Sequence, residues 1–345
     1  MSQANIAIPT GSLILVTGAN GFIASHIVDQ FLKRGYRVRG TVRSEKPWLD
    51  DYFATRYGAS HFESALLPEL GDEETLNKLM DGVAGVVHVA SDVSLKPDPE
   101  IISKSVARTL TVLEAAAKHD TVTQFVLTSS ASAASLPQPG QPGINIDSTT
   151  WNDGAVRSAW DPNVPVAHKP YLVYAACKTE SEREAWNWVT QNKPSFDFNT
   201  VLPGTVFGRI LHPEIGGSTM ALARSLLSGN RAGIDFVSPQ WFVDAEDTAR
   251  LHVAALLDTR VKSERLFAFA TPYNWTDIVN ILRKAFPLNS KIPHPPENEP
   301  RDLSLVGPSD RAESLIKECL GRDGWTSLEE SILGGTGDLE GFRGY

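Results

Sequence analysis

A tyrosine and a lysine, Tyr174 and Lys178, stand four positions apart in this 345-residue chain and are the first candidates for chemistry. Residues at this spacing share one face of a helix, so the phenol and the ammonium would lie side by side. A nearby cation stabilises a phenolate and lowers the pKa of a tyrosine toward neutrality, which suits a group that exchanges protons. The same spacing is common by chance, and an ordinary surface pair is the alternative interpretation.

A hydroxyl-rich triplet, Thr128-Ser129-Ser130, ends the apolar segment that begins at Gln124. If this segment is a parallel strand, its carboxyl end lies at the edge of the sheet where ligands bind. Ordinary loop hydroxyls are the alternative. The triplet nevertheless strengthens the case for the tyrosine–lysine pair, because both follow a glycine-rich loop typical of nucleotide sites.

That glycine-rich loop comes directly after the apolar segment 13–17 and has the pattern G-x-x-G-x-x-A. Glycines let the backbone turn sharply and approach a pyrophosphate, which the free N–H groups and dipole of the next helix stabilise. Simple turn glycines are the alternative, but the position at the first strand–helix junction favours a dinucleotide site. The residues expected to contact the cofactor here are Thr17, Gly18, Asn20, Gly21, Phe22 and Ile23.

The end of the second predicted strand, 36–42, indicates which dinucleotide binds. An NAD enzyme usually has Asp or Glu there for the ribose 2′-OH, whereas this chain has Arg43. A guanidinium binds a 2′-phosphate through paired charge-assisted hydrogen bonds, and a carboxylate would repel it. We therefore expect NADP(H), held by Arg43 with help from Lys46. The alternative is that Arg43 is only surface charge, as we expect for Arg39.

Secondary-structure elements must hold these residues in place. Strand and helix patterns alternate along the chain as far as Leu202. The predicted strands are 13–17, 36–42, 62–66, 85–90, 124–128 and 199–202. The predicted helices begin at 22 and then cover 72–80, 101–118, 171–191, 220–228, 245–257, 275–285 and 309–320, with a long loop at 136–170. Such alternation predicts an open parallel sheet with helices on both faces.

Length and composition limit the remaining possibilities. The chain carries a formal charge of -9 and has two cysteines, Cys177 and Cys319, which cannot form a disulfide framework or a zinc cluster. Its acidic balance argues against binding to nucleic acid or to acidic lipid. The uncharged segments 12–28 and 121–146 are interrupted by polar residues or turn formers, so we expect neither a signal peptide nor a membrane helix. We expect a cytoplasmic protein without a metal site, whose partner is a small molecule.

The glycine loop, the TSS triplet and the YxxxK pair occur in the order found in the extended short-chain dehydrogenase/reductase family, which the chain resembles over residues 12–332. The similarity is closest to the dihydroflavonol-4-reductase-like branch and to fungal NADPH-dependent aldehyde and ketone reductases. The segments that carry it are LVTGANGFIASHIV, YRVRGTVR, HVAS, FVLTSSASA, LVYAACKTESEREAW and GWTSLEESI. The resemblance implies an α/β, Rossmann-type doubly wound parallel sheet with a smaller C-terminal substrate-binding lobe.

In domain terms, we expect residues 1–202 to form the NADP-binding domain, to which 236–262 return. Residues 203–235 and 263–345 would form the smaller lobe, with a frayed end from Gly334.

The resemblance also implies roles for single residues. Ser130 would bind the substrate carbonyl, Tyr174 would donate the proton, and Lys178 would bind the nicotinamide ribose and lower the pKa of the tyrosine. The further cofactor contacts implied are Ala90, Ser91, Thr128, Pro203, Gly204, Thr205 and Val206. Relatives often have Asp-Leu after the third strand for adenine; this chain has Ala65-Leu66, so the adenine contacts stay open.

The reaction expected from this set is NADPH-dependent reduction of an aldehyde or ketone to an alcohol. The loop 136–170 and the segment 238–242 could line an apolar pocket, with Gln240 and Trp241 as substrate contacts, which favours aryl ketones, keto esters and other hydrophobic carbonyl compounds. Two alternatives are a nucleotide-sugar epimerase or dehydratase on the same scaffold and a non-catalytic NADP-binding regulator. Arg43 argues against the first, and the intact Ser/Tyr/Lys set argues against the second.

Overall fold

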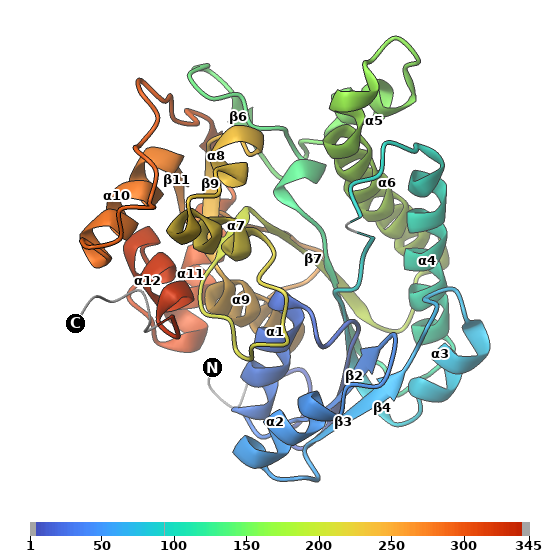
Figure 1. Ribbon diagram of the computed structural model, residues 1–345. Helices are drawn as coiled ribbons and strands as arrows, with labels where there is room; N and C mark the ends of the chain where they lie inside the picture. Colours follow the sequence, from blue (N-terminus) through green and yellow to red (C-terminus); the bar gives the residue numbers. More distant parts are fainter. Residues whose placement is uncertain (1–4, 93, 340–345) are drawn as a thin grey trace.

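The structure is a computed structural model that describes residues 5–92 and 94–339. Its centre is a seven-stranded sheet with the strand order β10-β7-β5-β4-β1-β2-β3, in which every neighbouring pair is parallel (Figure 1). The strands are β1 Leu13–Val16, β2 Arg37–Val42, β3 Phe62–Leu66, β4 Val83–His88, β5 Gln124–Thr128, β7 Asp197–Pro203 and β10 Arg265–Ala268. The chain runs from β1 outward to β3 and then returns to place β4 on the other side of β1. Such a switch opens a crevice at the carboxyl ends of β1 and β4, where ligands bind in sheets of this kind.

Helices cover both faces of the sheet. They are α1 Phe22–Leu32, α2 Pro47–Tyr57, α3 Glu73–Leu79, α4 Glu100–Ala117, α5 Asp153–Trp160, α6 Lys169–Asn192 and α9 Ala245–Leu257. On one face α1 packs against α9, and on the other α4 packs against α6 (Figure 1). Helix α3 joins α4, α5 joins α6, and α2 lies against β3.

The core follows from the strand sequences. Every residue of β1 is buried, and its side chains alternate between two apolar clusters, with Ile14 and Val16 in one and Leu13 and Leu15 in the other. A strand that is apolar on both faces is stable only between two layers of helices. The uninterrupted apolar segments in the sequence therefore specify a three-layer sandwich.

The smaller lobe is built on a three-stranded sheet in the order β11-β9-β8. The strands are β8 Thr205–Phe207, β9 Gln240–Asp244 and β11 Thr271–Tyr273, and a separate two-stranded sheet pairs β6 Asn145–Ile146 with β12 Leu305–Val306. The helices of this lobe are α7 Thr219–Ser225, α8 Ala232–Phe236, α10 Trp275–Ala285 and α12 Leu328–Thr336. Helix α11 Ser309–Leu320 packs instead against α9 and β10 of the main sheet. Its core is aromatic, because Phe207 meets Tyr273 and Trp275 edge to face.

The predicted doubly wound parallel sheet is confirmed, but several details of the prediction are wrong. Strand β10 (265–268) completes the main sheet beside β7, although residues from 263 onward were expected in the smaller lobe. Gly334 and Gly335 belong to helix α12 and are not frayed, while residues 340–345 lie outside the described part of the chain. The loop 136–170 contains β6 and α5. Helix α2 was not predicted, although its buried residues Leu49, Tyr52 and Phe53 have the i, i+3, i+4 spacing of a helix.

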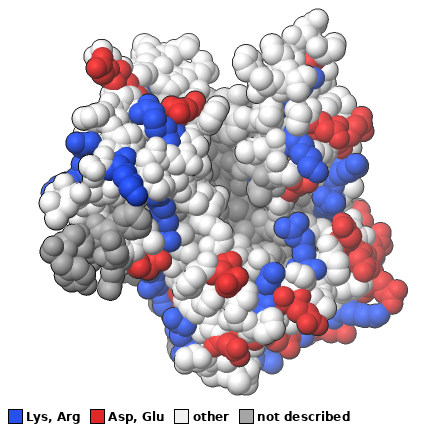
Figure 2. All heavy atoms as spheres, viewed as in Figure 1, with Lys and Arg blue, Asp and Glu red and all other residues white. Residues whose placement is uncertain are grey.

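A deep hollow opens between the smaller lobe and the helix pair α5 and α6 (Figure 2). The carboxyl ends of the central strands lie below it (Figure 1). We therefore expect the predicted cofactor and substrate sites to lie along this hollow.

Candidate active site

Helix α6 presents Lys178 to the carboxyl end of β5. The Lys178 Nζ donates a hydrogen bond of 3.2 Å to the Thr128 carbonyl oxygen, and the lysine is only 9% exposed. Burial lowers the pKa of Lys178 to about 8, against the opposing effects of Cys177 and Glu182. The side chain is thus an ammonium at neutral pH and loses its charge only in mildly alkaline solution.

Tyr174 lies one helical turn before Lys178 and is half-buried. Burial raises the pKa of Tyr174, while the neighbouring Ser130 hydroxyl lowers it in part. The expected shift of the pKa toward neutrality is therefore wrong for this structure, because burial outweighs the Ser130 hydrogen bond and Lys178 Nζ donates to a backbone carbonyl. A protonated Tyr174 suits a proton donor.

Ser130 follows β5 and begins a short 3₁₀ turn, 131–133. Its Oγ accepts hydrogen bonds from the Ser132 N–H at 3.2 Å and from the Ser132 hydroxyl at 2.9 Å. Since the Ser130 hydroxyl lowers the pKa of Tyr174 in part, these two predicted catalytic side chains lie together, and Lys178 reaches the same strand end at the Thr128 carbonyl oxygen.

A buried carboxylate supports this trio, and the sequence interpretation missed it. Glu182 is inaccessible to solvent and accepts hydrogen bonds of 2.7 Å from the Ser129 and Thr200 hydroxyls. It also forms a 2.8 Å ion pair with Arg265 of β10. Glu182 stands four residues after Lys178, so the same helical spacing that paired Tyr174 with Lys178 could have found it.

The glycine loop turns tightly beside the end of β4. Gly18 has φ +70°, and a Cβ at this position would lie 3.2 Å from the Ala90 Cβ. Only glycine adopts this conformation without cost and leaves the approach open. The Gly18 N–H is fixed by the Thr41 hydroxyl at 3.0 Å. Gly21 is the N-cap residue of α1, so the N–H groups of Phe22 and Ile23 lie in its first turn, where the helix itself offers no acceptor.

Thr17 was predicted to contact the cofactor directly, but its hydrogen bonds are all made within the protein. Its buried Oγ accepts the N–H groups of Val89 and Ala90 at 2.9 and 3.0 Å, which fills both of its acceptor positions. Its own proton is then donated to His88 Nδ1 at 2.9 Å. Burial lowers the pKa of His88 to about 3, so the ring is neutral and can accept this bond. Thr17 thus ties β1 to β4 and has no hydrogen-bonding capacity left for a ligand.

Two arginines near the end of β2 differ in their availability. Arg39 is held by Glu63 at 2.6 Å and by the Leu79 carbonyl oxygen at 2.7 Å. Arg43 is exposed, and no hydrogen bond or ion pair joins it to the described residues. Lys46 stands next to the first turn of α2 and is likewise without an ion-pair partner in the described chain. The two predicted phosphate contacts, Arg43 and Lys46, are thus unpaired among the described residues, whereas Arg39 is already bound within the protein.

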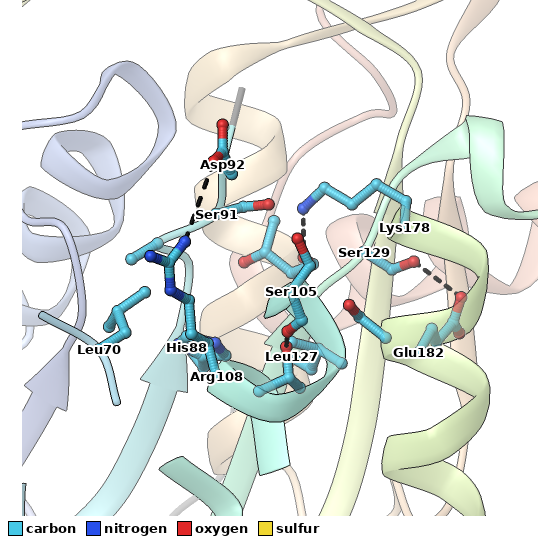
Figure 3. A pocket seen from close by; sticks show the side chains of 14 residues that line it. Leu70, His88, Ser91, Asp92, Ser105, Arg108, Leu127, Ser129, Lys178 and Glu182 are labelled. Atoms are coloured by element: carbon cyan, nitrogen blue, oxygen red, sulfur yellow. Dashed lines mark hydrogen bonds and ion pairs between the residues drawn. The ribbon is translucent and has the colours of Figure 1, made fainter. Parts of the chain in front are cut away.

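A polar pocket at the ends of β4 and β5 contains four of the predicted cofactor contacts, namely Ala90, Ser91, Thr128 and Lys178 (Figure 3). Asp92 and Arg108 form an ion pair of 3.9 Å on one side of it. The Thr128 hydroxyl donates to His252 Nε2 at 2.8 Å, which uses its proton and leaves it only as an acceptor for a cofactor.

The segment 203–206 connects the two lobes. The Gly204 N–H donates to the Ala268 carbonyl oxygen at 3.0 Å, and the Val206 carbonyl oxygen accepts from Thr219 at 2.5 Å. The Gly204 N–H and the Val206 carbonyl oxygen therefore already have partners within the protein. The predicted contacts to the nicotinamide carboxamide would have to come from other atoms of residues 203–206.

A second pocket lies beside the turn that follows Ser130. It is lined by Ala131 and Ser135, by the loop residues Leu136, Pro137, Gln138, Ile144 and Ile146, and by Gln240, Trp241, Phe269, Asp302 and Ser304. The structure thus places the first part of the predicted loop, 136–146, and both predicted substrate residues around one pocket. Trp151 is not part of it, because this ring packs 3.8 Å from the Arg265 guanidinium.

Neither a metal site nor a membrane span is found in the described chain. Residues 5–92 and 94–339 contain no group of three or more His, Cys, Asp or Glu side chains that could hold a metal ion. None of the helices in these ranges is long and apolar enough to cross a lipid bilayer.

Comparison with known proteins assigns the family. Residues 14–267 match the NAD dependent epimerase/dehydratase family. The chain belongs to this family. The match confirms the expected extended short-chain dehydrogenase/reductase type, and it covers the seven-stranded sheet except for Leu13 and Ala268 at its limits.

Within the epimerase/dehydratase family, the chain is similar to fungal reductases over its whole length. It is 43% identical to the ketoreductase adrE of Penicillium rubens, covering 97% of this chain and 99% of the relative. It is 38% identical to aldehyde reductase 2 of Sporidiobolus salmonicolor, covering 95% and 96%. Among solved structures, the yeast methylglyoxal/isovaleraldehyde reductase Gre2 complexed with NADPH has a TM-score of 0.78 and 22% identity, covering 95% of this chain and 99% of Gre2. The last likeness supports the fold alone.

Proposed function

We propose that this family member is an NADPH-dependent carbonyl reductase that converts aldehydes or ketones to alcohols. The observation that carries the proposal is the meeting of Ser130, Tyr174 and Lys178 at the end of β5, close to a glycine loop and an apolar pocket. The names of the fungal relatives, which are 38% and 43% identical over almost the whole chain, point to the same chemistry.

The residues present fit NADP(H). Gly18 leaves open a space beside Ala90 that a Cβ would narrow, and the first turn of α1 has N–H groups suited to a pyrophosphate. Arg43 and Lys46 supply positive charge that no described residue neutralises, as a 2′-phosphate requires. Lys178 would hold the nicotinamide ribose.

When bound, NADPH supplies the hydride that adds to the carbonyl carbon. The carbonyl oxygen then receives the π electrons of the C=O bond and becomes negatively charged. The residues of this chain stabilise and neutralise that charge. Ser130 donates a hydrogen bond to this oxygen, and Tyr174 transfers its proton to it, which completes the alcohol. The Lys178 ammonium then stabilises the phenolate until Tyr174 regains a proton from solvent.

The second pocket favours hydrophobic substrates. Its lining combines the aliphatic side chains of Leu136, Ile144 and Ile146 with the rings of Trp241 and Phe269, and the Trp241 Nε1 is already paired with Ser304 at 3.0 Å. Aryl ketones, keto esters and hydrophobic aldehydes are the proposed substrate class, with Gln240 as a polar contact.

An NADPH-oxidation screen over aldehydes, ketones and keto esters tests the proposal. We expect turnover with at least one hydrophobic carbonyl compound and far slower turnover with NADH. No turnover across the panel, with NADP(H) still bound in a fluorescence titration, would favour a regulator. Conversion of a nucleotide sugar without net NADPH consumption would favour an epimerase.

A further inference from the structure

The hydroxyl of Ser130 is held by a second serine that the proposed mechanism does not use. Ser132 directs both its backbone N–H and its side-chain hydroxyl to Ser130 Oγ, at 3.2 and 2.9 Å. Ser132 is only 2% exposed and lines neither of the two pockets. It therefore acts on the substrate only through Ser130.

The two bonds decide in which direction Ser130 can donate. A serine hydroxyl has one proton and two acceptor positions. Ser132 fills both acceptor positions of Ser130 Oγ, so the Ser130 proton is free to be donated away from the turn. That leaves it for the oxygen beside Tyr174, where the substrate carbonyl has to lie. A hydroxyl that accepts two hydrogen bonds is also a better donor, because neighbouring bonds in a chain polarise one another.

Ser132 is itself fixed by the loop that carries α5. The Asn152 side chain donates to the Ser132 carbonyl oxygen at 2.8 Å, and the Asn152 N–H donates to the Ala133 carbonyl oxygen at 2.9 Å. Asn152 is buried and also caps α5 by accepting the Ala155 N–H. The turn 131–133 is thus held from outside the catalytic strand, and Ser132 cannot swing away without breaking these bonds.

We propose that Ser132 is a positioning residue, which orients the Ser130 hydroxyl as a donor to the carbonyl oxygen of the substrate. This inference rests on the proposed carbonyl reduction and adds a residue that acts one step behind the catalytic trio. It predicts that the contribution of Ser132 exists only while Ser130 is present.

A double-mutant cycle tests this dependence. Ser132→Ala is expected to lower kcat/KM for ketone reduction about tenfold, the effect of one hydrogen bond, with NADPH affinity unchanged. Ser132→Thr keeps a hydroxyl and should recover most of the loss. In the Ser130→Ala background, adding Ser132→Ala should cause no further loss. Ser225→Ala is the matched control, since it removes a hydroxyl bonded to the Leu222 carbonyl oxygen in α7, away from both pockets.

A pH profile separates positioning from a merely structural effect. Oxidation of the alcohol needs the Tyr174 phenolate, which the Ser130 hydroxyl stabilises. The rise of the oxidation rate with pH should therefore move to higher pH in Ser132→Ala, while the midpoint of thermal unfolding stays near that of Ser225→Ala.

Each outcome has a distinct meaning. A tenfold loss that persists in the Ser130→Ala background, or an unmoved pH profile, would overturn the role of Ser132. Full activity of Ser132→Ala beside an impaired Ser130→Ala would do the same and leave the proposed function standing. Full activity of Ser130→Ala would instead overturn the proposed function.

Discussion

At the scale of single residues, burial gives the catalytic groups their proton affinities. Burial raises the pKa of Tyr174 and lowers that of Lys178 to about 8, so the two groups are phenol and ammonium at neutral pH. The first is the form that gives a proton, and the second is the form that stabilises the phenolate left behind. Burial thus favours the proton-donating form of Tyr174, while Lys178 keeps its charge at neutral pH although burial opposes that charge.

Tyr174→Phe removes the proton donor and keeps the ring. We expect kcat to fall by about a thousandfold or more, in line with the loss of a general acid, while NADPH binding changes little. Single-turnover rates and a fluorescence titration of NADPH measure the two effects separately. Turnover close to that of the unmodified protein would remove Tyr174 from the mechanism.

Lys178 gives a pH dependence with a definite sign. Its ammonium is present below its pKa of about 8 and is lost above it, so kcat/KM for reduction should fall as the pH rises through that value. Lys178→Arg keeps the charge to far higher pH and should lack this limb, whatever its absolute rate. If kcat/KM of Lys178→Arg falls at the same pH as that of the unmodified protein, the decrease belongs to another group.

Arg43→Ala tests the choice of cofactor. Loss of a charge-assisted contact should weaken NADPH about tenfold to a hundredfold and leave NADH almost unaffected. Arg39→Ala is the matched control, because Arg39 is engaged by Glu63 and the Leu79 carbonyl oxygen. Equal weakening of both cofactors by Arg43→Ala would contradict the assignment, as would a selective effect of Arg39→Ala.

At the scale of elements, one carboxylate joins the parts that carry the site. Glu182 of α6 meets Ser129 after β5, Thr200 of β7 and Arg265 of β10. Arg265 in turn donates to the Ser148 and Thr150 carbonyl oxygens of the loop before α5. The helix with Tyr174 and the strand before Ser130 therefore share a single buried anchor.

Glu182→Gln should destabilise the protein because it leaves the buried Arg265 charge without its partner. We expect the free energy of unfolding to fall by about 3 kcal/mol, as for other broken buried pairs. The double variant Glu182→Gln with Arg265→Met should recover much of this loss. Urea denaturation measures both, and an unchanged midpoint in the single variant would show that the pair is not stabilising.

At the scale of the whole molecule, three buried histidines are neutral inside the fold. Burial lowers the pKa of His26 from 6.5 to about 4, that of His88 to about 3 and that of His252 to about 4. Each binds a proton more readily in the unfolded chain than in the folded one. Stability is therefore complete above pH 6.5 and is lost as the pH falls toward the lower values.

His26→Gln isolates one of these groups. Gln can still donate to the Arg209 carbonyl oxygen, which His26 Nε2 reaches at 2.7 Å, but it does not titrate. Between pH 6 and 5 the unfolding free energy of the variant should fall less steeply, by up to about 1.4 kcal/mol per pH unit. Parallel urea titrations over this range measure the slopes. Identical slopes would mean that His26 is protonated in the fold.

The sequence was informative wherever one local pattern determined the structure. The bounds of β3, β5, α9, α10 and α11 agree with the predicted segments, since apolar periodicity and capping are local properties. The Ser130–Tyr174–Lys178 grouping followed from their places relative to the strand ends. Glu182 and Ser132 were missed because their partners are distant in sequence or depend on the shape of one turn. The pKa of Tyr174 was mispredicted, since burial is a property of the assembled fold.

Strand β10 has a consequence for how the chain is made. It closes the edge of the main sheet, yet it leaves the ribosome only after β8, β9 and the helices α7, α8 and α9 have been synthesised. Until then β7 presents an unpaired edge of backbone N–H and C=O groups, and Glu182 has no arginine beside it. Such an edge invites pairing with another chain. A product that ends before residue 265 should therefore self-associate, because β7 and Glu182 gain these partners only when β10 has been made.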